Sequence, residues 1–430
     1  MRQDLFHIPH EWLGLPVFGA GWMLILWVIV SGALLVWLWR RQGWNADTRS
    51  YLPILVMVGL LIWLVLPRLE DIPDAGPSKG LPIRGYGVML LVGVLAGVAL
   101  AVREARRVGM DPEIVLSLCF CIFVAGIIGA RLFYVIEYWP DFKRPTPSAT
   151  LGAILNVTQG GLVVYGSLIG AMLAGLWFVR RHALPALAMA DLMAPGLLLG
   201  AALGRIGCLL NGCCYGGLCE IPHVGVTFPA GSEPYKHQRS VGQLHGFQIS
   251  KDPTTGEAMV VAVEPGGSAA AAGLQIGAVL RAIDGRPVTS FDEARLALQV
   301  APPELQLATD RGPVTIRITR LPARSRPVHP TQLYAAVGSG ILCWLLWCYY
   351  PFRRRDGEVF ALLLTLYPVM RFLEEAIRVD EPGQFHTSLS ISQWISLILL
   401  AGVIALWVYI LRQPRGSELA LADNKRPLPD

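Results

Sequence analysis

Apolar residues gather in nine runs along the chain, most of them about as long as a membrane is thick. A membrane-spanning helix needs about 20 predominantly apolar residues, with a lower limit near 17. The second and eighth runs are the shortest. The runs are Trp22–Leu38, Leu52–Leu66, Tyr86–Val102, Ile114–Ile136, Leu162–Val179, Ala186–Leu203, Leu333–Tyr350, Val359–Phe372 and Ile391–Leu411. This pattern predicts nine transmembrane helices.

Positive charge follows every odd-numbered run, whereas the loops between mix cations with acids and prolines. Because Lys and Arg are enriched in cytoplasmic loops, we expect the N-terminus outside and the C-terminus inside. Met1–Trp12 has no basic leader region, and no small-residue cleavage site follows the first run. We therefore expect that run to remain as a helix.

The segment Leu218–Val328, between the sixth and seventh runs, has no membrane-length apolar run and falls on the outer side by the same rule. Part of it has the short alternating pattern of strands separated by turns. A helix is expected after Ser290, which stands three residues before Glu293 as in a capping box. The expected elements are strands Val260–Val263, Val279–Ile283 and Val314–Thr319 and helix Glu293–Gln299.

Pro-Gly-Gly-Ser-Ala-Ala, Ala-Gly-Leu and Ile-Asp-Gly follow one another in this segment. Their order resembles a PDZ domain over about Val241–Leu321. Such domains bind an extended peptide, often a C-terminus, by adding it as a strand at a sheet edge. The resemblance places Gly246, Phe247 and Ile249 at the loop that holds the peptide carboxylate. The alternative is a degenerate domain that serves only for packing.

The composition agrees with this pattern. The 430 residues are 53% hydrophobic and 16% charged, whereas soluble domains carry about 25% charged residues. The net charge of +5 is modest, and no feature predicts a nucleic-acid partner. We predict a polytopic α-helical membrane protein with an inserted extracytoplasmic α+β domain. The predicted domains are an N-terminal helix pair (1–78), four core helices (79–240), the insert (241–322), three further core helices (323–413) and a cytoplasmic tail (414–430).

The candidate chemistry lies in five polar stretches, all expected at the outer ends of helices. A charge at bilayer depth costs about 2.5–3.5 kcal/mol on insertion scales and is usually functional or paired. Arg205, at the end of the sixth run, is such a charge. The stretches are Gly85–Gly87, Gly160–Gly170, Gly204–Gly217, His329–Tyr334 and Arg371–Arg378.

Three arginines in these stretches suit a phosphate group. Helical spacing would place Arg371, Glu375 and Arg378 on one face, with Glu375 paired to one arginine and the other left for an anion. Guanidinium groups match phosphate geometry. Together with Arg205 they would hold a lipid phosphate and stabilise its charge as it leaves. A purely structural salt-bridge cluster is the alternative.

In order and spacing, the five stretches resemble the bacterial prolipoprotein diacylglyceryl transferases over about Leu81–Leu411, apart from the insert. The clearest match is Gly204–Arg205–x–Gly207–x–x–x–Asn211–Gly212. The family moves the diacylglyceryl group of phosphatidylglycerol to the lipobox cysteine of an exported prolipoprotein, giving a thioether and glycerol phosphate. The resemblance implies an inner-membrane transferase with an extracytoplasmic site. Its partners would be phosphatidylglycerol, prolipoprotein signal peptides and the lipid bilayer, without a cofactor.

The resemblance also implies residue roles. The catalytic residues would be Arg205, Arg371, Tyr165 and Glu375. The substrate-binding residues would be Tyr86, Asn211, Gly216, Arg378, His329, Gln332 and Arg131. Arg205 and Arg371 would contact the phosphate, and Glu375 would orient an arginine. Tyr165 stands where the family usually has histidine, and a phenol, with a pKa near 10 against about 6.5 for imidazole, is a poorer base at neutral pH.

Four of the eight cysteines crowd the Arg205 stretch: Cys208, Cys213, Cys214 and Cys219. The family commonly has asparagine and glutamate at Cys208 and Cys213, and tryptophan at Tyr215. Disulfides or simple packing are the default interpretation of the four. A thiol relay and a zinc site are alternatives, but the spacing is not a repeated Cys-x-x-Cys pair, and we predict no metal. Cys119, Cys121, Cys343 and Cys348 lie in apolar runs and should pack there.

Two other functions stay open on sequence grounds. One is a related phospholipid-dependent transferase with another acceptor, and the other is a membrane-anchored PDZ protein for binding or quality control. An intramembrane protease is set aside because the chain has neither His-Glu-x-x-His nor Gly-x-Ser-x-Gly.

Overall fold

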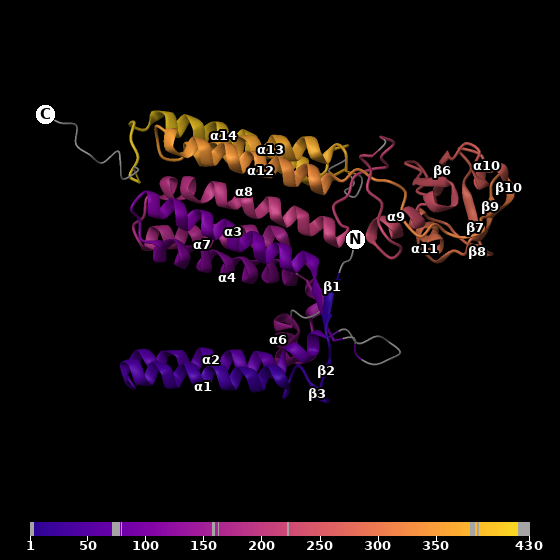
Figure 1. The fold of residues 1–430 in the computed structure, drawn as a ribbon. Coiled ribbons are helices and arrows are strands. Elements are labelled where there is room, and N and C mark those ends of the chain that lie inside the picture. The colour runs from indigo at the N-terminus through magenta and orange to yellow at the C-terminus, as the bar shows by residue number, and fades with distance from the viewer. Residues whose placement is uncertain are drawn as a thin grey trace. The chain divides into compact units, whose positions relative to one another are not determined.

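The computed structural model describes residues 4–70, 78, 80–156, 160–161, 163–221, 223–378, 383–384 and 387–419. In this part of the chain, every predicted apolar run lies on a helix (Figure 1). The helices are α1 (Trp22–Gln42), α2 (Ala46–Leu64), α3 (Gly85–Arg107), α4 (Pro112–Glu137), α7 (Val164–Arg181), α8 (Ala186–Asn211), α12 (Thr331–Tyr349), α13 (Glu358–Glu375) and α14 (Ile391–Arg412). Leu162, the first residue of the fifth run, lies outside the described residues.

Six helices of the described chain are long and apolar enough to cross a membrane, namely α1, α3, α4, α8, α12 and α14. This confirms a polytopic helical membrane protein. Three of the nine predicted spans, on α2, α7 and α13, do not reach that length and apolarity. Two of them have a visible reason, since α2 holds an apolar stretch of only Tyr51–Leu64 and α13 carries charged residues in its last turns.

The described residues form two compact units. The first takes in Leu198–Leu345 and Ala361–Tyr409. The second takes in the described residues of 4–197, 346–360 and 410–419. The division cuts through α8, α12, α13 and α14, so the two units do not coincide with the domain boundaries expected from the sequence.

Glycines bring the backbones of α4 and α7 together in the second unit, where the two helices lie side by side (Figure 1). A Cβ added to Gly129 would lie 2.4 Å from the Gly166 carbonyl oxygen, and one on Gly170 would lie 2.4 Å from that of Ala125. Small residues allow such close approach between membrane helices. The Gly-x-x-x-Gly spacing at the start of α7 therefore has a packing role.

Short strands near the N-terminus were not predicted. Strand β1 (Asp4–Ile8) pairs antiparallel with β4 (Leu81–Arg84), which leads directly into α3. Strands β2 (Glu11–Trp12) and β3 (Leu15–Pro16) form a small hairpin. The start of the chain thus fixes the position of the first residues of α3. The remaining short helices of this unit are η1 (Leu66–Leu69), α5 (Trp139–Phe142), α6 (Pro147–Leu155) and η3 (Tyr350–Phe352).

The insert between α8 and α12 has the strands and the helix expected from its sequence. They are β6 (Ala258–Val263), β7 (Leu280–Ile283), α11 (Phe291–Val300) and β10 (Gly312–Arg317). Strand order in the larger sheet is β10, β9 (Glu304–Thr309), β7 and β8 (Arg286–Pro287), and β5 (Phe247–Lys251) pairs with β6. The short helices are α9 (Glu233–Ser240), η2 (Gln243–His245) and α10 (Ser268–Ala271). Asp284 and Gly285 both have positive φ, as a tight hairpin turn between β7 and β8 requires.

The second edge of β5 is occupied by the chain itself. The Ile249 amide donates to the Val241 carbonyl oxygen at 3.0 Å, and the Phe247 amide donates to that of Gly242 at 3.3 Å. The side chains of Phe247 and Ile249 are buried in the core of the insert, where Val241 also packs. An incoming peptide strand would meet an edge whose amides are already hydrogen-bonded.

Candidate active site

Arg371, Glu375 and Arg378 form one charged cluster at the end of α13. Glu375 Oε2 lies 2.7 Å from Arg371 Nη2 and 3.6 Å from Arg378 Nη1. All three side chains are largely buried, with Glu375 only 3% exposed. Arg371 Nη2 also donates to Ser392 Oγ on α14 at 3.3 Å. One carboxylate therefore orients two arginines at once, whereas the sequence predicted a pair with one of them.

The geometry behind this cluster differs from the expected helix face. Helix α13 ends at Glu375, so Arg378 is not at an i+7 position of the helix. A turn carries it back, because the Arg378 amide donates to the Glu375 carbonyl oxygen at 3.1 Å. Residues 377 and 378 also pair with the loop that follows α8, because the Gly217 amide donates to the Ile377 carbonyl oxygen at 3.0 Å and Gly216 bridges to Arg378. Arg378 thus reaches Glu375 through loop pairing rather than helical periodicity.

Arg205 lies in the last two turns of α8, within the same unit. Its guanidinium interacts electrostatically with Tyr367 of α13. Buried Glu374 interacts electrostatically with Arg205, Arg371 and Arg378. Three arginines and two carboxylates therefore share this region. The sequence singled out the arginines but missed Tyr367 and Glu374, although Tyr367 stands one helical turn before Arg371.

A sharp turn ends α8 and begins the cysteine loop, which we define as residues 208–217. Gly212 takes a φ of 77°, and the Cys213 amide donates back to the Cys208 carbonyl oxygen at 3.2 Å. This is the bonding of a Schellman cap, which brings Cys208, the fourth-last residue of α8, next to Cys213, the second residue beyond its end. Cys214 follows with a φ of 58°, a left-handed conformation that is uncommon for residues other than glycine.

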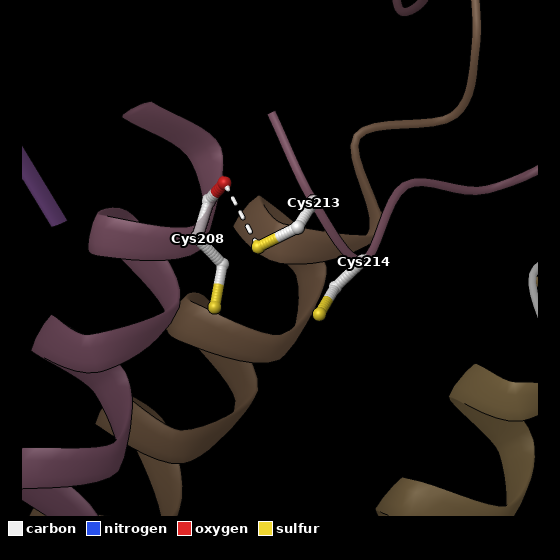
Figure 2. Close-up of side chains that lie close together, drawn as sticks. All are labelled: Cys208, Cys213 and Cys214. Atoms are coloured by element: carbon white, nitrogen blue, oxygen red, sulfur yellow. Dashed lines mark hydrogen bonds between the residues drawn. The ribbon is translucent and has the colours of Figure 1, made fainter. Parts of the chain in front are cut away.

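This turn gathers three sulfur atoms. The Sγ atoms of Cys208, Cys213 and Cys214 all lie within 4.8 Å of one another, and Figure 2 shows the three side chains converging from α8 and the loop after it. Asn211 forms a side-chain hydrogen bond with Cys213. Cys219, the fourth cysteine of the stretch, is buried apart from them, with its Sγ 3.8 Å from the Ile221 carbonyl oxygen.

The beginning of α12 holds the cysteine loop in place. Thr331 Oγ1 donates to the Cys214 carbonyl oxygen, and Gln332 Nε2 donates to that of Cys213, both at 2.7 Å. His329 exchanges backbone hydrogen bonds with Gly216 and Gly217 at 2.9 Å. A Cβ on Gly216 would lie 2.8 Å from that of His329, so only glycine fits there. In this structure His329, Gln332 and Gly216 shape the loop.

The pKa of the Cys214 thiol is lowered from its ordinary value. Hydrogen bonds from the Cys208 and Cys213 thiols contribute most, and the positive charges of Arg378 and Arg205 act in the same direction. Burial acts against them by disfavouring a charged sulfur. The net effect favours a thiolate at Cys214.

Three predicted site residues, Tyr86, Arg131 and Tyr165, belong to the second unit. Tyr86 lies in the first turn of α3 and Tyr165 in the first turn of α7, and both side chains are exposed. The prediction of Arg131 as a substrate contact needs correction. Its guanidinium is buried and donates five hydrogen bonds to backbone carbonyl oxygens, which leaves no donor for a ligand. The acceptors are Ala153, Ile154, Asn156, Gly160 and Gly161.

The chain as a whole is similar to known proteins of one family. The family model for prolipoprotein diacylglyceryl transferase matches residues 77–409. The chain is 37% identical to the phosphatidylglycerol–prolipoprotein diacylglyceryl transferase of Rhodopirellula baltica, over 93% of this chain and 87% of that protein. It is 25% identical to the enzyme of the same name from Clostridium tetani, over 77% of this chain and 93% of the relative. A Bacillus mycoides relative of that name is 38% identical over 147 residues, or 34% and 52% of the two chains.

Proposed function

Because this chain belongs to the prolipoprotein diacylglyceryl transferase family, we propose that it transfers the diacylglyceryl group of phosphatidylglycerol to the lipobox cysteine of prolipoproteins. The acceptor sulfur attacks the glyceryl carbon, a thioether forms, and the carbon–oxygen bond to phosphate breaks. Glycerol phosphate leaves with one more negative charge than the phosphate had in the lipid. An environment for that reaction has to stabilise the new charge.

The observation that carries this proposal is the gathering of three arginine side chains around Glu374 and Glu375. Arg371 and Arg378 share one carboxylate oxygen, so neither charge is fully neutralised by it. Arg205 adds a third guanidinium beside Tyr367. Because these side chains are largely shielded from water, their attraction for a phosphate is stronger than it would be in bulk solvent. Arg205 and Arg371 are the proposed phosphate contacts, Arg378 an additional one, and Glu375 their positioning residue.

The other predicted contacts fall into two groups. Asn211, His329, Gln332 and Gly216 hold the cysteine loop in shape, so we propose that they bind substrate through the surface of that loop. Tyr86 and Tyr165 are proposed to meet the lipid headgroup or the acceptor from the first turns of their helices. Tyr165 is suited to donate a hydrogen bond rather than to remove a thiol proton.

The sidedness of the site is also part of the proposal. Basic residues follow the odd-numbered apolar runs, which lie on α1, α3, α7, α12 and α14, whereas the cysteine loop follows the sixth run. Because basic residues are enriched in cytoplasmic loops, this alternation favours an extracytoplasmic site. Cys219 is buried and unsuitable for a labelling test. A Glu220→Cys variant, at an exposed position, should react with an impermeant thiol reagent in intact cells beyond the wild-type background. Arg181→Cys, at the exposed end of α7, should react only after lysis, and the reverse pattern would show that the orientation is inverted.

We further propose that the insert binds part of the exported substrate. In this structure the β5 edge is paired with Val241 and Gly242, so strand addition at Gly246, Phe247 and Ile249 requires that segment to move away. Replacing Val241–Leu321 by a short Gly-Ser linker should then raise KM for protein acceptors while sparing short lipobox peptides. Unchanged kinetics on every protein acceptor would rule out docking by the insert.

The main proposal is tested with purified protein, phosphatidylglycerol and a lipobox peptide, followed by intact-mass analysis. We expect a diacylglyceryl mass increase on a peptide with cysteine and none on the same peptide with serine. Arg205→Gln should abolish the product, whereas Arg181→Ala should leave it unchanged. A cysteine peptide that gains no diacylglyceryl mass from the wild-type protein would contradict the proposal.

A further inference from the structure

The three converging thiols of the cysteine loop have no part in the chemistry described so far. We propose that Cys208, Cys213 and Cys214 bind a zinc ion whose fourth position takes the acceptor thiol. The metal site stands on the geometry of the loop alone. Its role with the acceptor rests on the proposed transferase function.

The spacing of the sulfur atoms suits one mononuclear ion. Zinc binds cysteine sulfur at about 2.3 Å in tetrahedral geometry, which places the ligand sulfurs about 3.8 Å apart. The three Sγ atoms already lie within 4.8 Å of one another, so small side-chain rotations would complete the set. Among the described residues no other group of three or more His, Cys, Asp or Glu side chains comes together in this way. Three protein ligands with an open fourth position are typical of catalytic zinc.

Bringing the three sulfur atoms together requires a strained backbone conformation at Cys214. The Schellman cap alone explains why Cys208 and Cys213 are neighbours. It does not explain the third sulfur, because Cys214 has a left-handed backbone that costs about 1–2 kcal/mol for a residue with a side chain. Thr331 and Gln332 hold that conformation through the carbonyl oxygens of Cys214 and Cys213. Such hydrogen bonds orient a loop that carries metal ligands.

The positive charges beside the cysteine loop suit a zinc ion bound by three thiolates. Three thiolates and one Zn²⁺ carry a single net negative charge. Arg205 and Arg378 both interact electrostatically with Cys214, and so offset that charge. The three cysteines are half-buried rather than fully enclosed, which leaves an approach for a fourth ligand.

A disulfide is the competing use of these cysteines. It would join two sulfurs and leave the third without a partner, whereas one ion uses all three. The three thiols are free in this structure. The loop therefore fits a three-sulfur ligand set better than a two-sulfur bond.

The ion would promote deprotonation of the acceptor thiol, for which the Tyr165 phenol is a poor base. A free thiol has a pKa near 8.5, so only a few per cent is thiolate at pH 7, whereas a thiol bound to zinc is deprotonated. The acceptor proton passes to water as the sulfur binds the ion. The sulfur then uses its electron pair to bond the glyceryl carbon, and the carbon–oxygen bond pair leaves with glycerol phosphate. The neutral thioether is a weak ligand and dissociates.

Metal content tests the site without reference to activity. The full-length protein is purified from membranes without chelators, and its metals are measured by mass spectrometry. We expect about one zinc per chain, falling at least fivefold in Cys208→Ala, Cys213→Ala and Cys214→Ala. Cys219→Ala and Cys343→Ala are matched controls, one in the same stretch and one on α12, and should keep the ion. Gel filtration of each variant shows that it is folded.

Several results would overturn the site. They are a wild-type protein without stoichiometric zinc, a different ion at that stoichiometry, equal loss of zinc in Cys219→Ala, or a disulfide between any two of the three cysteines. The disulfide is detected by alkylating the unreduced protein and measuring its mass.

Cobalt substitution tests the role of the ion. The ligand-field spectrum of cobalt-loaded protein should change when a cysteine lipobox peptide is added and stay constant with the serine peptide. An active protein whose cobalt spectrum ignores the cysteine peptide would overturn acceptor binding. Stoichiometric zinc in a protein that transfers no diacylglyceryl group would overturn the transferase function and leave the metal site standing.

Discussion

Arg131 and Arg371 show how differently two buried arginines can be used in one chain. Arg131 donates five hydrogen bonds to backbone carbonyl oxygens of residues 153–161, so all its donors are occupied. Arg371 lies 2.7 Å from Glu375 and donates one bond to Ser392. The first arginine fixes a loop, while the second shares its counter-charge with Arg378. Only the second can give positive charge to a ligand.

The difference lies in what accepts the hydrogen bonds. Carbonyl oxygens satisfy the donors of a guanidinium but carry no formal charge, so they hold it in one place. The close approach of this loop to Arg131 also requires a glycine at position 161. A Cβ added to Gly161 would lie 2.7 Å from Arg131 Nη1. A shared carboxylate orients two guanidinium groups and leaves net charge for an anion. Whether a buried arginine is able to bind an anion therefore depends on which groups accept its hydrogen bonds.

Replacing Arg371 by glutamine should have the largest effect. The amide has a similar reach but no charge, so the leaving phosphate loses a main contact. We expect turnover to fall about 100- to 1,000-fold, the range for losing one preorganised donor to developing charge. The measurement is initial rate with phosphatidylglycerol and a lipobox peptide. Arg371→Lys keeps the charge without the planar donor pair, so its turnover should lie between those of the wild type and Arg371→Gln. A glutamine variant within fivefold of wild type would remove Arg371 from the phosphate site.

Much of the fold could be predicted from the sequence, because lipid requires long apolar helices with internally bonded backbones. The apolar runs gave the helices, and alternation with turn residues gave the strands of the insert. The pairing of β1 with β4 could not be predicted, since a five-residue strand finds its partner more than seventy residues away. The pairing of Val241 with Ile249 was missed for a different reason, because no periodicity marks a single residue at a sheet edge.

The structure brings several of the predicted site residues together, but through a geometry that the sequence did not predict. Arg205, Arg371, Glu375 and Arg378 do lie in one unit with the cysteine loop. The turn after Glu375 was not foreseen, because helical spacing alone placed Arg378 on the helix. The convergence of three sulfurs depends on a left-handed Cys214, which a sequence pattern does not reveal. Hydrogen-bond partners such as those of Arg131 likewise depend on loops brought together by folding.

Replacing Glu375 by glutamine should have an intermediate effect. The amide still accepts a hydrogen bond, but it no longer holds two guanidinium groups by charge. We expect kcat to fall about tenfold as the arginines lose their fixed positions, with a smaller change in KM for lipid. The matched control is Glu233→Gln, an exposed ion-pair partner of Lys236 on α9, which should change neither constant. If Glu375→Gln lowered activity as much as Arg371→Gln, the carboxylate would be acting directly on substrate.

Replacing Arg131 by lysine should have the smallest effect on turnover and a clear effect on stability. Lysine offers three donors where arginine offers five, so at least two buried carbonyl oxygens lose their partner. At about 1–3 kcal/mol for each unsatisfied group, we expect the loss of stability to be about 2–6 kcal/mol. Hydrogen exchange at Ala153–Asn156 should speed up, and the unfolding temperature in detergent should fall, while the rate per folded enzyme stays within about threefold. Arg144→Lys, which lies in the same region but is exposed, should change neither measurement. If Arg131→Lys instead raised KM for phosphatidylglycerol with unchanged stability, Arg131 would be a lipid contact, and the contrast with Arg371 would fail.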